Sequence, residues 1–360
     1  MLRPAHLDLS LIGQPLPWDL FTESGVLVAG QGLVIADENH FLRLAGRALF
    51  VKSEPGPNLG GLPERLTELV AQADALLSAP PEALDVVALD HTARDLSALW
   101  QVDADACLGF TRRAGRARPA VTHSVQVLFV SLLLADQLEI GAAERDSLAG
   151  AALSMNLGDL ELHDRLAEPH PNLTADDRRR LREHPRRAAE LLAAAGLADP
   201  VWLACVLQHH ESMDGSGYPA GLAGPDLGLG ARILRVADIY CGKTGAREYH
   251  PTHSTRLAVQ EIFGRERTGL DSQLAILLLR RLGVYPPGTL VRLASREIAC
   301  ITRRGRGGLV RFAVSFLDAR GRPLDPPRER DLDTRQYQLR GVVDTEPHWP
   351  AIDWKCLWGY

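Results

Sequence analysis

The spacing of the hydrophobic residues changes twice along the 360-residue chain. Up to about Lys52, apolar residues occur in short runs, such as residues 25–28 and 32–35, which glycine and aspartate separate and which are typical of β-strands. From about residue 62 to residue 282 they recur at helical spacing. After Gly283 short apolar runs and turns return. The pattern predicts a mainly α protein, a helical bundle flanked by a small N-terminal β-containing region and a small C-terminal β subdomain.

Changes in this pattern also suggest where regions begin and end. The stretch from Ser53 to Leu62 is rich in proline and glycine and is typical of a linker. Thr174 followed by Asp176 and Asp177 predicts a helix start, because a threonine cap and an acidic first turn suit the helix dipole. The expected regions are a leader at 1–52, a linker and two helices at 53–111, the main helical domain at 112–283, and a β appendage and tail at 284–360.

Composition and charge narrow the functional class. The formal net charge of -5 argues against binding to a nucleic-acid polymer along the whole chain. The five cysteines are scattered without C-x-x-C spacing, which favours reduced thiols in the cytoplasm. No apolar run approaches the roughly 20 residues that cross a bilayer. The longest, residues 125–135, predicts no membrane span, and the N-terminus does not resemble a signal peptide.

The strongest chemical signal is the segment QHHESMDGSGYPAG at residues 208–221. Adjacent helical residues point about 100° apart, so His209 and His210 can flank a shared cleft. The histidines are followed by a loop whose characteristic residues are Asp214, Gly215, Gly217, Tyr218 and Pro219. A polar helix end that runs into a glycine turn is the alternative interpretation. The complete combination favours a functional site.

This segment resembles the signature of the HD-GYP family, HD phosphohydrolases that hydrolyse cyclic di-GMP with two or three metal ions. The resemblance covers about residues 112–251 closely, and the flanking regions also resemble segments often found beside this domain. It implies a helical HD-domain fold with cyclic di-GMP as ligand. The metal ligands that it implies are His123, His184, His209, His210 and Asp238. The substrate-binding residues that it implies are Tyr218, Arg247 and Tyr249, in a stretch that also includes Thr244 and Pro251.

One part of the family pattern is missing. Where the family has H-D-x-G-K, about thirty residues after the first histidine, this chain has Met155, Asn156, Leu157, Gly158 and Asp159. A literal His163-Asp164 pair follows eight residues later. We interpret that pair as lying outside the ligand set, because eight helical residues rise more than about 10 Å.

The replacements weaken a two-metal centre in three ways. Asn156 is neutral, so it cannot bridge two cations as a carboxylate does. Met155 offers a soft thioether in place of imidazole. Asp159 would put an anion near the phosphates. His123 and Asp238 would remain for one metal, and three histidines for another.

Three imidazoles are enough for a partial or mononuclear site for Fe, Mn or Zn. The alternative is that the histidines bind one another or water and no metal is present.

Three functions therefore stay open. The first is a cyclic-di-GMP signalling protein with a degenerate metal site, weak or absent hydrolysis, and a nucleotide-binding or regulatory role. The second is an active metal-dependent phosphodiesterase that recruits Asp159 or His163. The third is a protein-interaction module that binds a partner such as a diguanylate cyclase domain.

Overall fold

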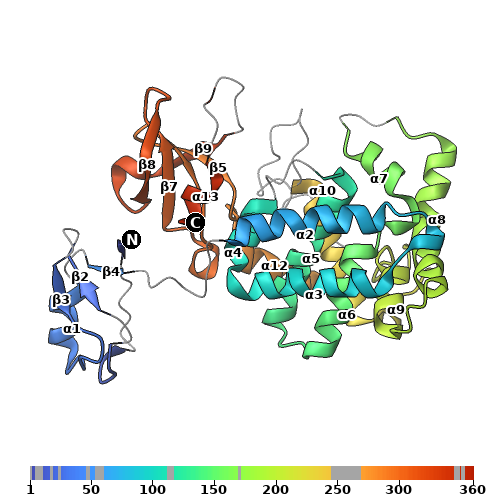
Figure 1. The fold of residues 1–360 in the computed structure, drawn as a ribbon, viewed down its shortest axis with the longest axis horizontal. Helices are drawn as coiled ribbons and strands as arrows, with labels where there is room; N and C mark the ends of the chain where they lie inside the picture. The colour runs from blue at the N-terminus through green and yellow to red at the C-terminus, as the bar shows by residue number, and fades with distance from the viewer. Residues whose placement is uncertain are drawn as a thin grey trace. The chain divides into compact units, whose positions relative to one another are not determined.

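A computed structural model describes residues 2–4, 11–16, 19–22, 26–45, 49–52, 61–111, 117–168, 172–244, 269–343, 349 and 353–360 (Figure 1). The chain forms two compact units, Met1–Gly60 and Gly61–Tyr360. Each unit has its own hydrophobic core. The finer division at residues 111 and 283 stays a prediction.

The first unit contains an antiparallel sheet in the order β1-β4-β2-β3. Its elements are β1 (Leu2–Pro4), β2 (Leu20–Phe21), β3 (Leu27–Ala29), α1 (Glu38–Ala45) and β4 (Phe50–Lys52). The predicted run at 32–35 contributes only isolated bridges from Val34 and Ile35. Helix α1 was not predicted; Asp37 starts it by accepting a hydrogen bond from the His40 backbone N–H.

Helices make up most of the second unit (Figure 1). They are α2 (Leu62–Leu77), α3 (Val86–Val102), α4 (Ala104–Thr111), α5 (Pro119–Gln137), α6 (Ala142–Ser154), α7 (Leu160–Leu166), α8 (Ala175–Ala194), α9 (Pro200–Gln208), α10 (Leu229–Thr244), α12 (Ser272–Leu282) and α13 (Trp354–Trp358). Short 3-10 turns lie at Pro81–Ala83, Leu157–Asp159 (η4), Gly224–Asp226, Arg306–Gly308 and Arg335–Tyr337. The expected start at Thr174 is confirmed, because Thr174 and Asp177 form a reciprocal capping box.

Helix α5 is the centre of the bundle. Its residues from Val127 to Ala135 are buried without interruption, as expected for a helix surrounded by others. At 19 residues it is long and apolar enough to cross a membrane, which differs from the shorter run seen in the sequence. However, 72% of its most apolar window is buried inside the protein, so it is weak evidence for a span.

The C-terminal residues form an antiparallel sheet in the order β8-β7-β6-β5-β9. Its strands are β5 (Leu290–Leu293), β6 (Ile298–Cys300), β7 (Phe312–Leu317), β8 (Pro323–Asp331) and β9 (Leu339–Val342). Arg304 pairs with Asp105, and Trp358 packs so closely on Gly109 of α4 that a Cβ there would lie 2.1 Å from the indole. The predicted mainly α architecture with small flanking sheets is confirmed.

Candidate metal centre

His184 is positioned by the proline that follows it. Pro185 lies inside α8 and has no N–H, so the carbonyl of Leu181 loses its usual helical donor. The Nδ1 of His184 lies 2.8 Å from that carbonyl oxygen. Because a carbonyl only accepts, Nδ1 carries the hydrogen and the Nε2 lone pair faces away from α8.

His209 is held in the same way at the end of α9. Its Nδ1 lies 2.6 Å from the carbonyl oxygen of Val206, one of the last carbonyls of the helix. The Nε2 of His209 then also presents a lone pair. It lies 3.1 Å from the Nε2 of His184.

Two lone pairs at this distance repel unless a cation lies between them. Burial lowers the pKa of both His184 and His209, which disfavours an imidazolium as that cation. Two nitrogens 3.1 Å apart can both bind one metal ion at roughly 2.0–2.1 Å. Ligand atoms of His184, His209 and His210 all lie within 4.8 Å of one another. The donor set therefore fits a divalent metal.

His123 of α5 and Asp238 of α10 form a second group of ligand atoms. The Nε2 of His123 lies 2.8 Å from the Oδ1 of Asp238. Burial alone would raise the pKa of Asp238, but the hydrogen bond from His123 and the nearby His210 and His209 lower it below its usual range. The carboxylate is thus ionised and near the histidine cluster. The structure brings together all five predicted ligands, although metal binding by them stays a prediction.

His210 has the opposite tautomer from its neighbours. Arg235 donates from its NH1 nitrogen to the Nδ1 of His210 at 3.0 Å. A guanidinium only donates, so Nδ1 supplies the lone pair, and in the neutral ring Nε2 carries the hydrogen. His210 can bind a metal only if its hydrogen bond from Arg235 breaks or if Nε2 loses its hydrogen. Sequence analysis missed Arg235, although its place three residues before Asp238 on α10 puts it on the same face.

Comparison with known proteins finds relatives of this part of the chain. A family model described as an HD domain matches residues 108–274. Cyclic di-GMP phosphodiesterase PA4108 of Pseudomonas aeruginosa is 28% identical over 268 residues, 74% of this chain and 64% of that protein. Cyclic di-GMP phosphodiesterase response regulator RpfG of Xanthomonas campestris pv. campestris is 30% identical over 195 residues, 54% of this chain and 45% of that protein. The chain spans less than two thirds of either relative.

Among solved structures, Bd1817, a HDG"Y"P protein from Bdellovibrio bacteriovorus, superposes with a TM-score of 0.52. The match covers 76% of this chain and 97% of that chain at 17% identity, which shows a shared fold. Residues 108–274 form an HD domain, and these findings support a member of the HD-GYP family. The resemblance inferred from residues 208–221 is therefore confirmed.

Residues 155–159, which the sequence comparison with the family pattern predicts to replace its His-Asp pair, pack against α8. A Cβ on Gly158 would lie 2.2 Å from the backbone oxygen of His184, so only glycine allows this approach. Met155 is fully buried in the hydrophobic core. Asn156 is 1% exposed, and its Nδ2 has no hydrogen-bond partner among the described residues.

Asp159 forms an ion pair that was not predicted. We expected its anion to lie near the phosphates, and both of its carboxylate oxygens accept hydrogen bonds from Arg180 at 2.7 Å. Its Oδ1 also accepts a hydrogen bond from the Leu162 backbone N–H at the start of α7. The side chain is 4% exposed, so its charge is neutralised locally and it acts as a helix cap.

The two residues of the later His163-Asp164 pair have different contacts. Asp164 binds Arg118 and the backbone N–H of Ala120 at the start of α5, away from the cluster. His163 lies with its ring edge-on to His184, with ring centres 4.7 Å apart. Its Nε2 is buried without a hydrogen-bond partner in the described part of the chain. Burial, then the nearby His123, lower its pKa to about 4.

That His163 lies outside the ligand set stays a prediction, although its ring lies beside the cluster. Its position three residues after the buried Leu160 on α7 is the signal that sequence analysis could have used.

The HD-GYP loop after the histidines brings Tyr218 to His210. Glu211 accepts hydrogen bonds from the backbone N–H groups of Ala220, Gly221 and Leu222, which close the loop. A Cβ on Gly217 would lie 2.4 Å from a backbone nitrogen, and Gly215 has a φ of +78°, so both positions favour glycine. Asp214 accepts from the backbone N–H and hydroxyl of Ser216. Pro219 follows Tyr218 through a cis peptide bond.

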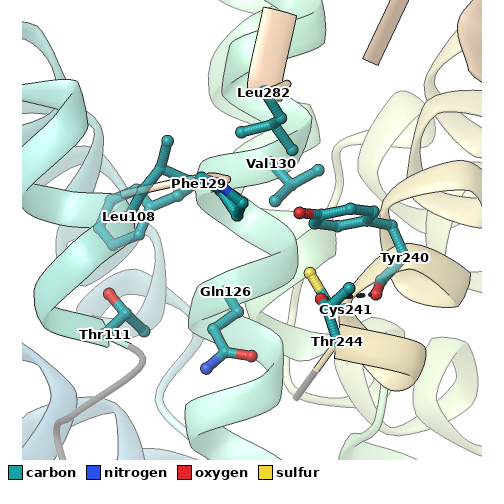
Figure 2. Close-up of a pocket in the computed structure, with 10 residues that line it drawn as sticks. Leu108, Thr111, Gln126, Phe129, Val130, Tyr240, Cys241, Thr244 and Leu282 are labelled. Atoms are coloured by element: carbon teal, nitrogen blue, oxygen red, sulfur yellow. Dashed lines mark hydrogen bonds between the residues drawn. The ribbon is translucent and has the colours of Figure 1, made fainter. Parts of the chain in front are cut away.

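Tyr218 then stacks on His210 with ring centres 4.8 Å apart. Thr244 ends α10 and donates its hydroxyl to the carbonyl of Tyr240 (Figure 2). Arg247, Tyr249 and Pro251 lie outside the described residues.

A small cavity lies one helical turn beyond His123 and Asp238 on the same two helices. Gln126, Tyr240 and Cys241 line it from α5 and α10 (Figure 2). Its volume of about 20 Å³ is room for a water molecule and not for a nucleotide.

Proposed function

We propose that this HD-GYP protein binds cyclic di-GMP for signalling and hydrolyses it weakly or not at all. The observation that carries the proposal is Asn156 at the position of the bridging carboxylate. A neutral amide offers one oxygen and no charge, so two adjacent cations lose the group that holds them together. The names of the two relatives described above, both cyclic di-GMP phosphodiesterases, support the choice of nucleotide.

The two groups of ligand atoms would hold metal unequally. His184 and His209 present lone pairs to one ion, whereas His123 and Asp238 alone supply too few ligands to hold a second ion. A bound divalent ion would polarise a phosphoryl oxygen and lower the pKa of a bound water. Imidazole and carboxylate donors suit Fe, Mn or Zn. The protein itself orients the imidazoles through backbone carbonyls and keeps Asp238 ionised.

A second function is supported by His163. Its buried Nε2 without a described partner is a donor that the family pattern does not require. With His123 and Asp238 it could replace the lost histidine, which would give an active metal-dependent phosphodiesterase. A protein-interaction module that binds a diguanylate cyclase domain is the remaining alternative. We place the protein in the cytoplasm, in line with its five free cysteines.

Metal analysis combined with binding and hydrolysis assays tests the proposal. The full chain is purified, its Fe, Mn and Zn content is measured, and cyclic di-GMP is added with and without each metal. We expect binding of the nucleotide, no more than one metal ion per chain, and turnover close to a metal-free control. Rapid metal-dependent turnover would support the second function instead. An absence of both binding and turnover would leave the interaction module.

A further inference from the structure

Two arginines beside the histidine cluster lack a carboxylate partner within the described part of the chain. Arg235 donates to His210, and its buried Nε has no partner there. Arg182 of α8 is exposed and lies with its guanidinium carbon 5.5 Å from the ring centre of Tyr218. Many other arginines in this unit pair with a carboxylate, among them Arg118, Arg145, Arg180, Arg232, Arg304 and Arg330.

Both arginines lie close to Tyr218, the tyrosine of the family motif. The Tyr218 ring stacks on His210, which is the acceptor for Arg235, and Arg182 lies over the same tyrosine. Burial raises the pKa of Tyr218, Arg235 acts to lower it, Asp238 raises it, and Arg182, most weakly, lowers it. The phenol is thus near two positive charges that come from different helices.

The ionised carboxylate of the cluster forms no ion pair with either arginine. Asp238 is hydrogen-bonded to His123, and no ion pair joins it to Arg235 or Arg182 among the described residues. A partly buried cation without a counter-ion is costly, and a planar guanidinium matches two oxygens of a phosphate group. Arg235 has five N–H donors, of which His210 receives one. Donors therefore remain for an anion from outside.

We propose that Arg235 and Arg182, with Tyr218 between them, form a metal-independent binding site for a phosphodiester group of a cyclic dinucleotide. The inference rests on the proposed function, because it assigns the contacts by which this protein would hold its nucleotide without a complete metal centre. Arg235 supplies fixed positive charge at the edge of the cluster, and the exposed Arg182 closes over the phosphate. The site binds the nucleotide and contributes no hydrolytic step.

Binding to metal-free protein tests this site. The full chain is stripped with a chelator, its metal content is checked, and its affinity for cyclic di-GMP is measured by calorimetry. We expect the stripped protein to bind. Arg235→Met and Arg182→Met should each weaken binding about tenfold or more, since each removes a charged contact to phosphate. Arg187→Met, on an exposed position of the same helix as Arg182, is the matched control and should change affinity less than about twofold.

Each alternative result has a distinct meaning. Unchanged affinity in both arginine variants would overturn the subsite and leave the proposed function intact. Binding that appears only after metal is restored would also overturn it, because the metal would then hold the phosphate. An absence of binding under both conditions would overturn the proposed function as well. Arg182 is exposed, so its variant keeps the test decisive if Arg235→Met fails to fold.

Discussion

Single residues determine which nitrogen each histidine offers to a metal. Pro185 frees a carbonyl that fixes His184, and the end of α9 frees another that fixes His209. Arg235 has the opposite effect on His210. It donates a hydrogen bond to Nδ1, so Nδ1 is the acceptor in this ring. Three neighbouring histidines of one chemical type therefore do not form three equivalent ligands.

The first prediction follows from this difference. Arg235→Met should raise the amount of zinc that the purified protein binds, because it frees His210 to change tautomer and removes a positive charge beside the cluster. Methionine is of similar length and apolar, so it fills the space without a charge. Metal per chain, measured by mass spectrometry after dialysis against zinc, checks the change against the natural protein and Arg187→Met. Equal zinc content in all three proteins would show that His210 does not limit uptake.

At the scale of elements, α7 carries two aspartates that stabilise the fold and one histidine that lies beside the cluster. Asp159 caps its N-terminus and pairs with Arg180, and Asp164 ties its last turn to the start of α5. His163, between them, faces the cluster. A lysine at residue 159, as in the family pattern, would lose the cap and face Arg180 with a like charge. The Asp159 substitution therefore stabilises α7 in this chain.

Helix α8, which carries His184, should depend on its capping box. Thr174→Ala removes the side-chain acceptor for the Asp177 backbone N–H. We expect it to lower the free energy of unfolding by about 1 kcal/mol. Urea denaturation followed by circular dichroism measures the change. Arg178→Ala, an exposed change on the same helix, should have little effect.

The same cap predicts a pH dependence. Hydrogen bonds from the Thr174 backbone and side chain, then from Arg165, lower the pKa of Asp177 from 3.8 to about 2. A lowered pKa in the folded state stabilises the protein above pH 3.8, and this stabilisation is lost as the pH falls toward 2. The stability difference between the natural protein and Asp177→Asn should shrink over that interval. A difference that stays constant from pH 5 to pH 2 would contradict the assignment.

At the scale of the whole molecule, the sequence predicts helices and strands, whose hydrophobic residues recur at regular spacing. It does not predict the side-chain contacts that depend on how the helices pack together. Helical periodicity located the bundle, and the family resemblance named five residues that the structure brings together, because a metal site requires particular residue types. Arg235 was missed, and the position of His163 beside the cluster was not predicted, since both depend on which helix face meets the cluster. The ion pair of Asp159 was not predicted because its partner, Arg180, lies on another helix.

The last prediction concerns repair of the metal centre. Met155→His together with Asn156→Asp should add a second metal ion and raise cyclic-di-GMP hydrolysis well above that of the natural protein. His123 and Asp238 already lie together, and a carboxylate at residue 156 would restore the bridge. Asn156→Asp alone should therefore help more than Met155→His alone. Without metal, the new buried carboxylate is costly, so added manganese should raise the melting temperature more in the double variant than in the natural protein. Met155→Leu, which changes the core and adds no ligand, is the matched control. A double variant that binds two ions and stays inactive would show that the cleft has diverged beyond its ligands, which would favour the interaction module.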